Sequence, residues 1–216
     1  MSEFIPTFFL IITSYLTLYL TIWLHEVGHA LAYWSFGCKE NPWKVRVPFY
    51  LFGSTPEPVD DACASSLNSA QQIIVAISGV LVNCLFGVLG LLIISFIQFL
   101  PIGLYVFLYC FALAHFIEAG SYLVINGLFL ASDTAVIAEH APRSRWLLLV
   151  VASSTLIPAT ALLVHKASDL GHALFGPTSA DSLWQLSVAI LSVVVMTIMG
   201  IARVIFTANN KKQAGH

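Results

Sequence analysis

The sequence predicts an all-α polytopic membrane protein with about five transmembrane helices and a short strand-bearing cytoplasmic loop after the first helix. Of its 216 residues, 58% are hydrophobic and only 9% are charged, and the mean hydropathy is +0.88. Soluble domains carry about 25% charged residues, so this composition excludes an ordinary soluble enzyme and a disordered chain. Nine basic residues against eleven acidic ones leave no excess of positive charge, so we expect no nucleic-acid partner.

Five apolar stretches are long enough to cross a bilayer, for which about 20 residues suffice. They cover residues 4–33, 71–100, 102–130, 145–165 and 184–207. The second and third are separated only by Leu100-Pro101 and therefore form a hairpin, and Pro158 predicts a kink in the fourth. We interpret residues 1–216 as a single membrane domain, with a core unit over residues 4–140 and two further helices over 145–207.

The longest segment outside these stretches, residues 37–70, carries a strand-like pattern. Val45, Val47 and Phe49 occupy alternate positions, and the turn-rich residues 53–58 follow them. This pattern predicts one or two short strands and a loop. An exposed strand edge there could hold an extended peptide by β-addition; the alternative is a purely structural re-entrant loop.

The basic residues predict the orientation in the membrane. Eight of the nine fall on one side of the predicted spans, namely Lys39, Lys44, Arg46, Arg143, Arg145, Arg203, Lys211 and Lys212, and Lys166 falls on the other. Because basic residues concentrate in cytoplasmic loops, we expect the amino terminus outside and the carboxyl terminus in the cytoplasm, in a bacterial cytoplasmic membrane. Cys38 and Cys63 then face a reducing compartment, where we expect no disulfide between them.

The first stretch contains the sequence His25-Glu26-Val27-Gly28-His29, an HExxH motif. Residues four apart project from one face of a helix, so both imidazoles can bind one metal ion. Glu26 lies beside them and can take a proton from an attacking water molecule. Ionisable groups inside a span are costly and usually functional. The alternative is a hydrogen-bonded polar cluster without a metal.

A catalytic zinc ion usually has three protein ligands, so a third must come from elsewhere in the chain. The third span and its continuation offer His115, Glu118, Asn126 and Asp133, spaced so that they share one helix face. The predicted orientation places Asp133 near the depth of the HExxH motif, whereas Glu118 and His115 lie deeper. We therefore expect Asp133 as the third ligand and keep Glu118 in reserve; a site without a third protein ligand stays open.

These motifs resemble those of the site-2 protease family, the intramembrane zinc metalloproteases. His25-Glu26-Val27-Gly28-His29-Ala30 resembles the family's HExGHA, and Gly79-Val80-Leu81-Val82-Asn83 is similar to its GPxxN. The segment from Asn126 to Asp133 resembles, more loosely, the family's Asn-x-x-Pro-x-Pro-Leu-Asp-Gly. The likeness covers roughly residues 15–140, and the order of the motifs along the chain also agrees. Val80 replaces the proline of GPxxN, the third motif has no proline, and Thr134 stands where the family has glycine.

The resemblance implies a zinc-dependent intramembrane metalloendopeptidase that cleaves a transmembrane or membrane-proximal segment of a membrane protein near the cytoplasmic face. It implies one zinc ion per chain, with His25, His29 and Asp133 as ligands. Glu26 is the expected catalytic residue, acting as general base and then as acid. Asn83 or Asn126 could donate a hydrogen bond to the developing oxyanion or contact the substrate; an asparagine in a span more often forms an ordinary interhelical hydrogen bond.

Two other functions stay open at this point. A non-catalytic member of the same fold could serve as a scaffold or accessory subunit of a larger membrane complex, and the altered third motif favours this reading. A small transporter would use the polar face of the third span, but five spans without an internal repeat argue against it. Metal content separates the protease from the scaffold, since only the protease requires zinc.

Overall fold

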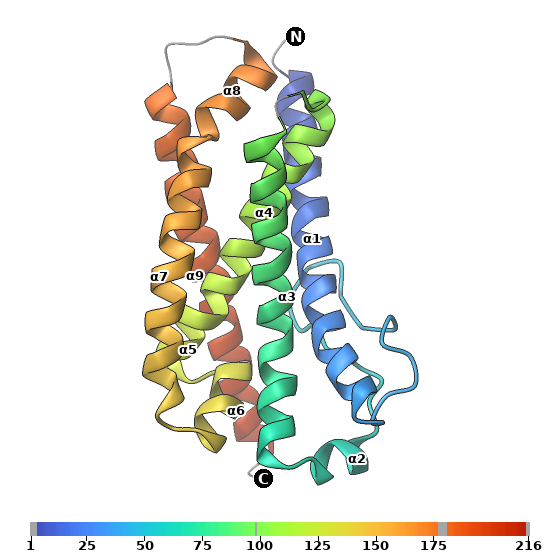
Figure 1. Ribbon diagram of the computed structural model, residues 1–216. Helices are drawn as coiled ribbons and strands as arrows, with labels where there is room; N and C mark the ends of the chain where they lie inside the picture. The colour runs from blue at the N-terminus through green and yellow to red at the C-terminus, as the bar shows by residue number, and fades with distance from the viewer. Residues whose placement is uncertain (1–3, 98, 177–180, 215–216) are drawn as a thin grey trace.

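The computed structural model describes residues 4–97, 99–176 and 181–214. Within this part of the chain, five helical segments are long and apolar enough to cross a membrane. They are α1 (Phe4–Ser35), α3 (Ser69–Phe96), the segment Ile102–Phe129, the segment Trp146–Phe175, and the larger part of α9 (Asp181–Ala214). Helix α1 begins at one end of the bundle and α9 ends at the other, as five crossings require (Figure 1). The prediction of an all-α polytopic membrane protein is confirmed.

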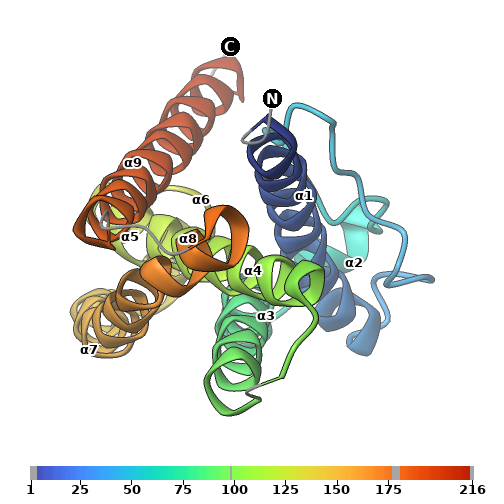
Figure 2. The same ribbon diagram turned by 90° about the horizontal axis from the view of Figure 1, so that it is seen from above.

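Helix α4 (Ile102–Gly120) lies in the middle of the bundle (Figure 2). It packs against α1 and α3 on one side and against α7 (Ser144–His165) and α9 on the other. Apolar side chains such as Val106 and Tyr109 are completely buried along it. Much of the surface of α7 and α9 is exposed and apolar, as expected for helices that face lipid.

Helices α1 and α3 approach closely where both carry small residues. A Cβ atom added at Gly28 would lie 2.7 Å from the carbonyl oxygen of Ser78, so only glycine fits there. Helix α3 begins with a capping box, in which the Asn68 side chain accepts from the backbone of Gln71 and the Gln71 side chain accepts from the backbone of Asn68. The capping box fixes where α3 begins, and Gly28 lets α3 pack closely against the HExxH helix α1.

The loop after α1 differs from its prediction in two respects. Of the predicted strands, the structure has a single antiparallel bridge between Arg46 and Thr55. Cys38 and Cys63 form a disulfide, which corrects the expectation of free thiols and joins the loop to the short helix α2 (Asp61–Ser66). The ammonium of Lys39 donates to the carbonyl oxygens of residues 44, 56 and 58, so the loop folds around a buried cation.

The segment between the fourth and fifth predicted spans, residues 166–183, is partly helical. Helix α8 (Ala167–Phe175) follows α7 directly, so the fourth membrane span reaches further than the sequence indicated. Residues 177–180 lie outside the described part of the chain. Helix α7 continues through Pro158.

The third span ends in an irregular segment that positions the next helix. After α4 the chain forms a π-helix, η1 (Ser121–Asn126), and one further turn, α5 (Gly127–Phe129). Leu130 and Ser132 then take left-handed backbone conformations, with φ of 51° at each, which cost about 1–2 kcal/mol for residues other than glycine. The helix breaks there without proline, and α6 (Ser132–His140) begins in a new direction.

Candidate metal centre

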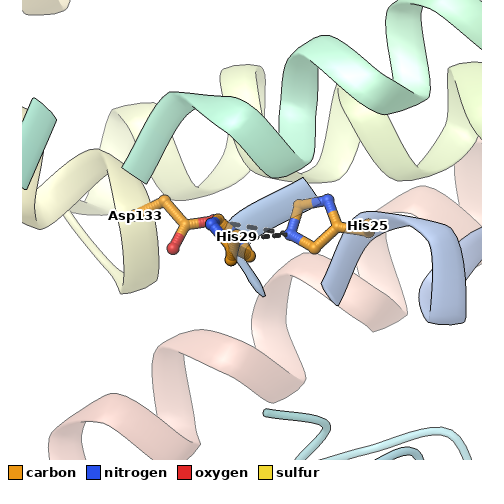
Figure 3. Close-up of side chains that lie close together, drawn as sticks. All are labelled: His25, His29 and Asp133. Atoms are coloured by element: carbon orange, nitrogen blue, oxygen red, sulfur yellow. Dashed lines mark hydrogen bonds and ion pairs between the residues drawn. The ribbon is translucent and has the colours of Figure 1, made fainter. Parts of the chain in front are cut away.

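Three side chains that can bind a metal converge between α1 and α6. The Nε2 atoms of His25 and His29 are 3.0 Å apart. One carboxylate oxygen of Asp133, Oδ2, lies 3.5 Å from the first of these nitrogens and 3.3 Å from the second. Figure 3 shows the carboxylate and both rings directed toward a common point. The three residues predicted as zinc ligands are thus the ones that the fold brings together.

Helix α3 covers this cluster with a glycine. A Cβ atom added at Gly79 would lie 2.5 Å from His29 Nε2 and 2.8 Å from His25 Nε2. These contacts are shorter than any that real Cβ atoms make, so glycine at this position leaves open the space in front of both nitrogens. The glycine of the GPxxN-like motif therefore has a steric role at the site.

The donor atoms also suit a divalent cation. His29 Nδ1 lies 2.7 Å from the carbonyl oxygen of Val75 and must donate to it, so the neutral ring, which is the form that binds a metal, has its lone pair at Nε2. Asp133 Oδ2 is buried and accepts no hydrogen bond of good geometry within the described part of the chain. Burial raises the pKa of the Asp133 carboxyl, but the neighbouring imidazoles, His29 foremost, outweigh this effect and hold the pKa well below its usual value. Two imidazoles and a carboxylate are a common ligand set for catalytic zinc.

The Glu26 side chain reaches the loop that follows α1. Its side chain is buried, and its Oε1 accepts a hydrogen bond of 2.7 Å from the Ser54 hydroxyl. Both residues line a cavity of about 320 Å³, together with His29, Asp133 and Tyr122. The cavity thus contains the candidate base and two of the candidate ligands. Sequence reasoning missed Ser54, because nothing in the turn-rich loop indicates which hydroxyl reaches the helix.

A second cavity of about 180 Å³ adjoins the first. The two share Ser54, Tyr122 and Ser132 as lining residues. The second extends from there toward α9, where Arg203 and Phe206 line it. The two cavities therefore lie side by side between α9 and the candidate ligands.

Two of the predicted site residues lie apart from this cluster. The reserve ligand Glu118 forms a buried ion pair with Arg203 and accepts a hydrogen bond from Ser121. The guanidinium of Arg203 in turn lies 4.1 Å from the centre of the Tyr122 ring. Asn126 is completely buried, and its side-chain atoms have no hydrogen-bond partner among the described residues. Neither residue is among those lining the cavity that contains Glu26.

Asn83 lies next to the cluster rather than in the cavity. Its amide is within 3.0 Å of His25 Nδ1 on one side and 3.0 Å of His115 Nδ1 on the other, and both neighbours are completely buried. The ring of Tyr122 stacks on His25 at 4.3 Å between centroids. His25 is therefore held on two sides, by an amide and by an aromatic face.

Comparison with known proteins finds no matching family model, no curated relative and no similar solved structure.

Proposed function

We propose that this chain is an intramembrane zinc metalloendopeptidase, which hydrolyses a peptide bond in a transmembrane or membrane-proximal segment of another membrane protein. One observation supports this proposal above all. The Nε2 atoms of His25 and His29 and a carboxylate oxygen of Asp133 lie within 4.8 Å of one another, beside a cavity that Glu26 also lines. Two buried imidazoles and a partly buried carboxylate are a ligand set that hydrolytic zinc sites use.

When bound there, zinc would polarise the scissile carbonyl and lower the pKa of a water molecule to about 7. Glu26 would accept the proton of the attacking water and return it to the leaving amine, as general base and then as acid. Ser54 orients the Glu26 carboxylate through its hydroxyl. Asn83 is engaged by two imidazoles, so we assign it to holding His25 rather than to the oxyanion.

The arrangement also supports the likeness to the site-2 protease family. That family breaks the helix before its aspartate with prolines, which this chain lacks. Here a π-helix and the left-handed residues Leu130 and Ser132 break the helix instead and bring Asp133 to the two imidazoles. The departures in the third motif therefore do not argue against metal binding.

A substrate helix must be unwound before its peptide bonds can reach the site, because helical carbonyls and amides are hydrogen-bonded to each other. The cavity between α9 and residues 51–54 adjoins the cavity that Glu26 lines. An extended segment there would pass Ser54 and Tyr122 on its way to Glu26. We propose this path for the substrate.

The distribution of basic residues supports a site near the cytoplasmic face, with the amino terminus outside. The disulfide between Cys38 and Cys63 favours the opposite orientation, because disulfides persist in oxidising compartments. Alkylation of free thiols in cells quenched with acid measures whether the two cysteines are oxidised in the cell, and so decides between the two orientations. A fully oxidised pair, as in the structure, would place the loop outside, and two free thiols would place it in the cytoplasm.

The catalytic proposal is tested with Glu26→Gln and His25→Ala. The first should retain zinc and lose cleavage of a membrane-embedded substrate, since Glu26 is the base and not a ligand. The second should lose both. Zinc-free wild-type protein, purified without chelators, would refute the protease and support a scaffold in a membrane complex.

A further inference from the structure

A line of hydrogen bonds, which includes two of the three candidate ligands, extends into the bundle from His29. It links His29, His25, Asn83 and His115 through successive contacts of 3.0 Å each. At its far end His115 is completely buried between the rings of Phe86 and Phe111. The proposed function assigns no role to His115.

The atoms of this line give it a direction. His115 Nδ1 donates to the side-chain oxygen of Asn83, and the Asn83 amide nitrogen donates to His25 Nδ1. A neutral imidazole carries one proton, so the proton of His25 is at Nε2, where it meets the lone pair of His29 Nε2 at 3.0 Å. His29 then donates from Nδ1 to the Val75 carbonyl. Every link has one donor and one acceptor.

Metal binding through Nε2 of His25 is incompatible with that direction. The lone pair must be at Nε2, so the proton must be at Nδ1, where it needs an acceptor. Rotating the Asn83 amide by 180° supplies its oxygen to His25 and turns its nitrogen toward His115. The Nδ1 atom of His115 must then accept, and its proton must be at Nε2. Each ring has one proton before and after, so the number of protons balances.

We propose that His115 is a positioning residue of the metal site, whose proton shifts from Nδ1 to Nε2 when His25 becomes a ligand. This inference rests on the proposed zinc site. His115 Nε2 is buried and has no hydrogen-bond partner among the residues that the structure describes, so the shift leaves an unpaired N–H in an aromatic pocket. Such a group is costly, and His115 therefore opposes metal binding and tunes the affinity.

Nitrogen NMR of the whole protein, labelled with ¹⁵N-histidine, tests the shift directly. Without zinc we expect His115 protonated at Nδ1; with one equivalent of zinc we expect it protonated at Nε2, with His25 protonated at Nδ1. His140, which contacts Gln72 away from this line, is the internal control and should not change. A loaded protein in which His115 keeps its proton at Nδ1 would overturn the inference.

Two variants of similar size at Asn83 provide a second test. In Asn83→Asp the carboxylate accepts from both Nδ1 atoms at once, so no reversal is needed, and zinc affinity should rise about tenfold while His115 stays protonated at Nδ1. In Asn83→Leu both contacts are lost, and affinity should fall about 10- to 100-fold. Phe111→Leu, which changes the packing around His115 but none of these hydrogen bonds, should leave the zinc-dependent shift in place.

The outcomes separate this inference from the proposed function. Wild-type protein that binds no zinc would refute both. Zinc binding with an unchanged proton position at His115, or with equal affinities in the two Asn83 variants, would refute the role of His115 and leave the zinc site standing.

Discussion

Replacing Gly79 with alanine adds one methyl group at the point where α3 covers the candidate metal centre. The new Cβ would lie 2.5 Å from His29 Nε2 and 2.8 Å from His25 Nε2. An ordinary contact needs about 3.4 Å or more, so each ring must move by roughly 0.6–0.9 Å. Metal sites tolerate displacements of only about 0.2 Å in ligand distance. The methyl group also occupies space that a cation would need.

We therefore expect Gly79→Ala to lower zinc affinity by at least about 100-fold, or about 2.7 kcal/mol. Its effect on the fold should be small, because the preference for alanine over glycine inside a helix, about 1 kcal/mol, offsets part of the cost of moving two buried rings. Competition with a chromophoric chelator measures the affinity, and thermal unfolding in detergent without zinc measures the stability.

Gly90→Ala is the matched control on the same helix. Its Cβ would lie 3.0 Å from the Cβ of Ala112 and far along α3 from the imidazoles, so it disturbs helix packing without entering the site. It should bind zinc like the wild type. If Gly79→Ala also binds zinc like the wild type while remaining folded, the metal is not held between these two nitrogens and the steric reasoning is wrong.

Three further substitutions test the helix break, the buried ion pair and the hydrogen bond to Glu26 described above. Leu130→Gly should stabilise the protein by about 1 kcal/mol in thermal unfolding, because it relieves a left-handed backbone conformation; a loss of stability would show that the leucine side chain outweighs this strain. Arg203→Met should destabilise by about 3 kcal/mol, since it leaves the carboxylate of Glu118 buried without a partner, and an unchanged unfolding temperature would contradict this. Ser54→Ala should keep zinc and lower kcat about tenfold, because Glu26 loses its hydrogen bond; unchanged kcat would mean that Ser54 does not orient the base.

The helices and the two imidazoles could be predicted from the sequence because both depend on local spacing. Long apolar runs specify helices in a bilayer, and residues four apart share a helix face whatever surrounds them. Asp133 could be selected because its depth follows from the length of the third span and from the orientation.

Contacts between distant parts of the chain could not be predicted in this way. Glu118 was a plausible ligand until the fold paired it with Arg203, 85 residues further along. The contact of Ser54 with Glu26 and the disulfide from Cys38 depend on the path of an irregular loop, for which no periodic pattern exists. In place of the predicted strands the loop forms one bridge, because an isolated pair of short strands has little to stabilise it.

Zinc stoichiometry of the purified protein tests the central claim most directly. Protein isolated without chelators and measured by inductively coupled plasma mass spectrometry should contain about one zinc per chain, and His25→Ala and His29→Ala should each contain almost none. Wild-type protein without zinc, or an unchanged zinc content in both variants, would contradict the account.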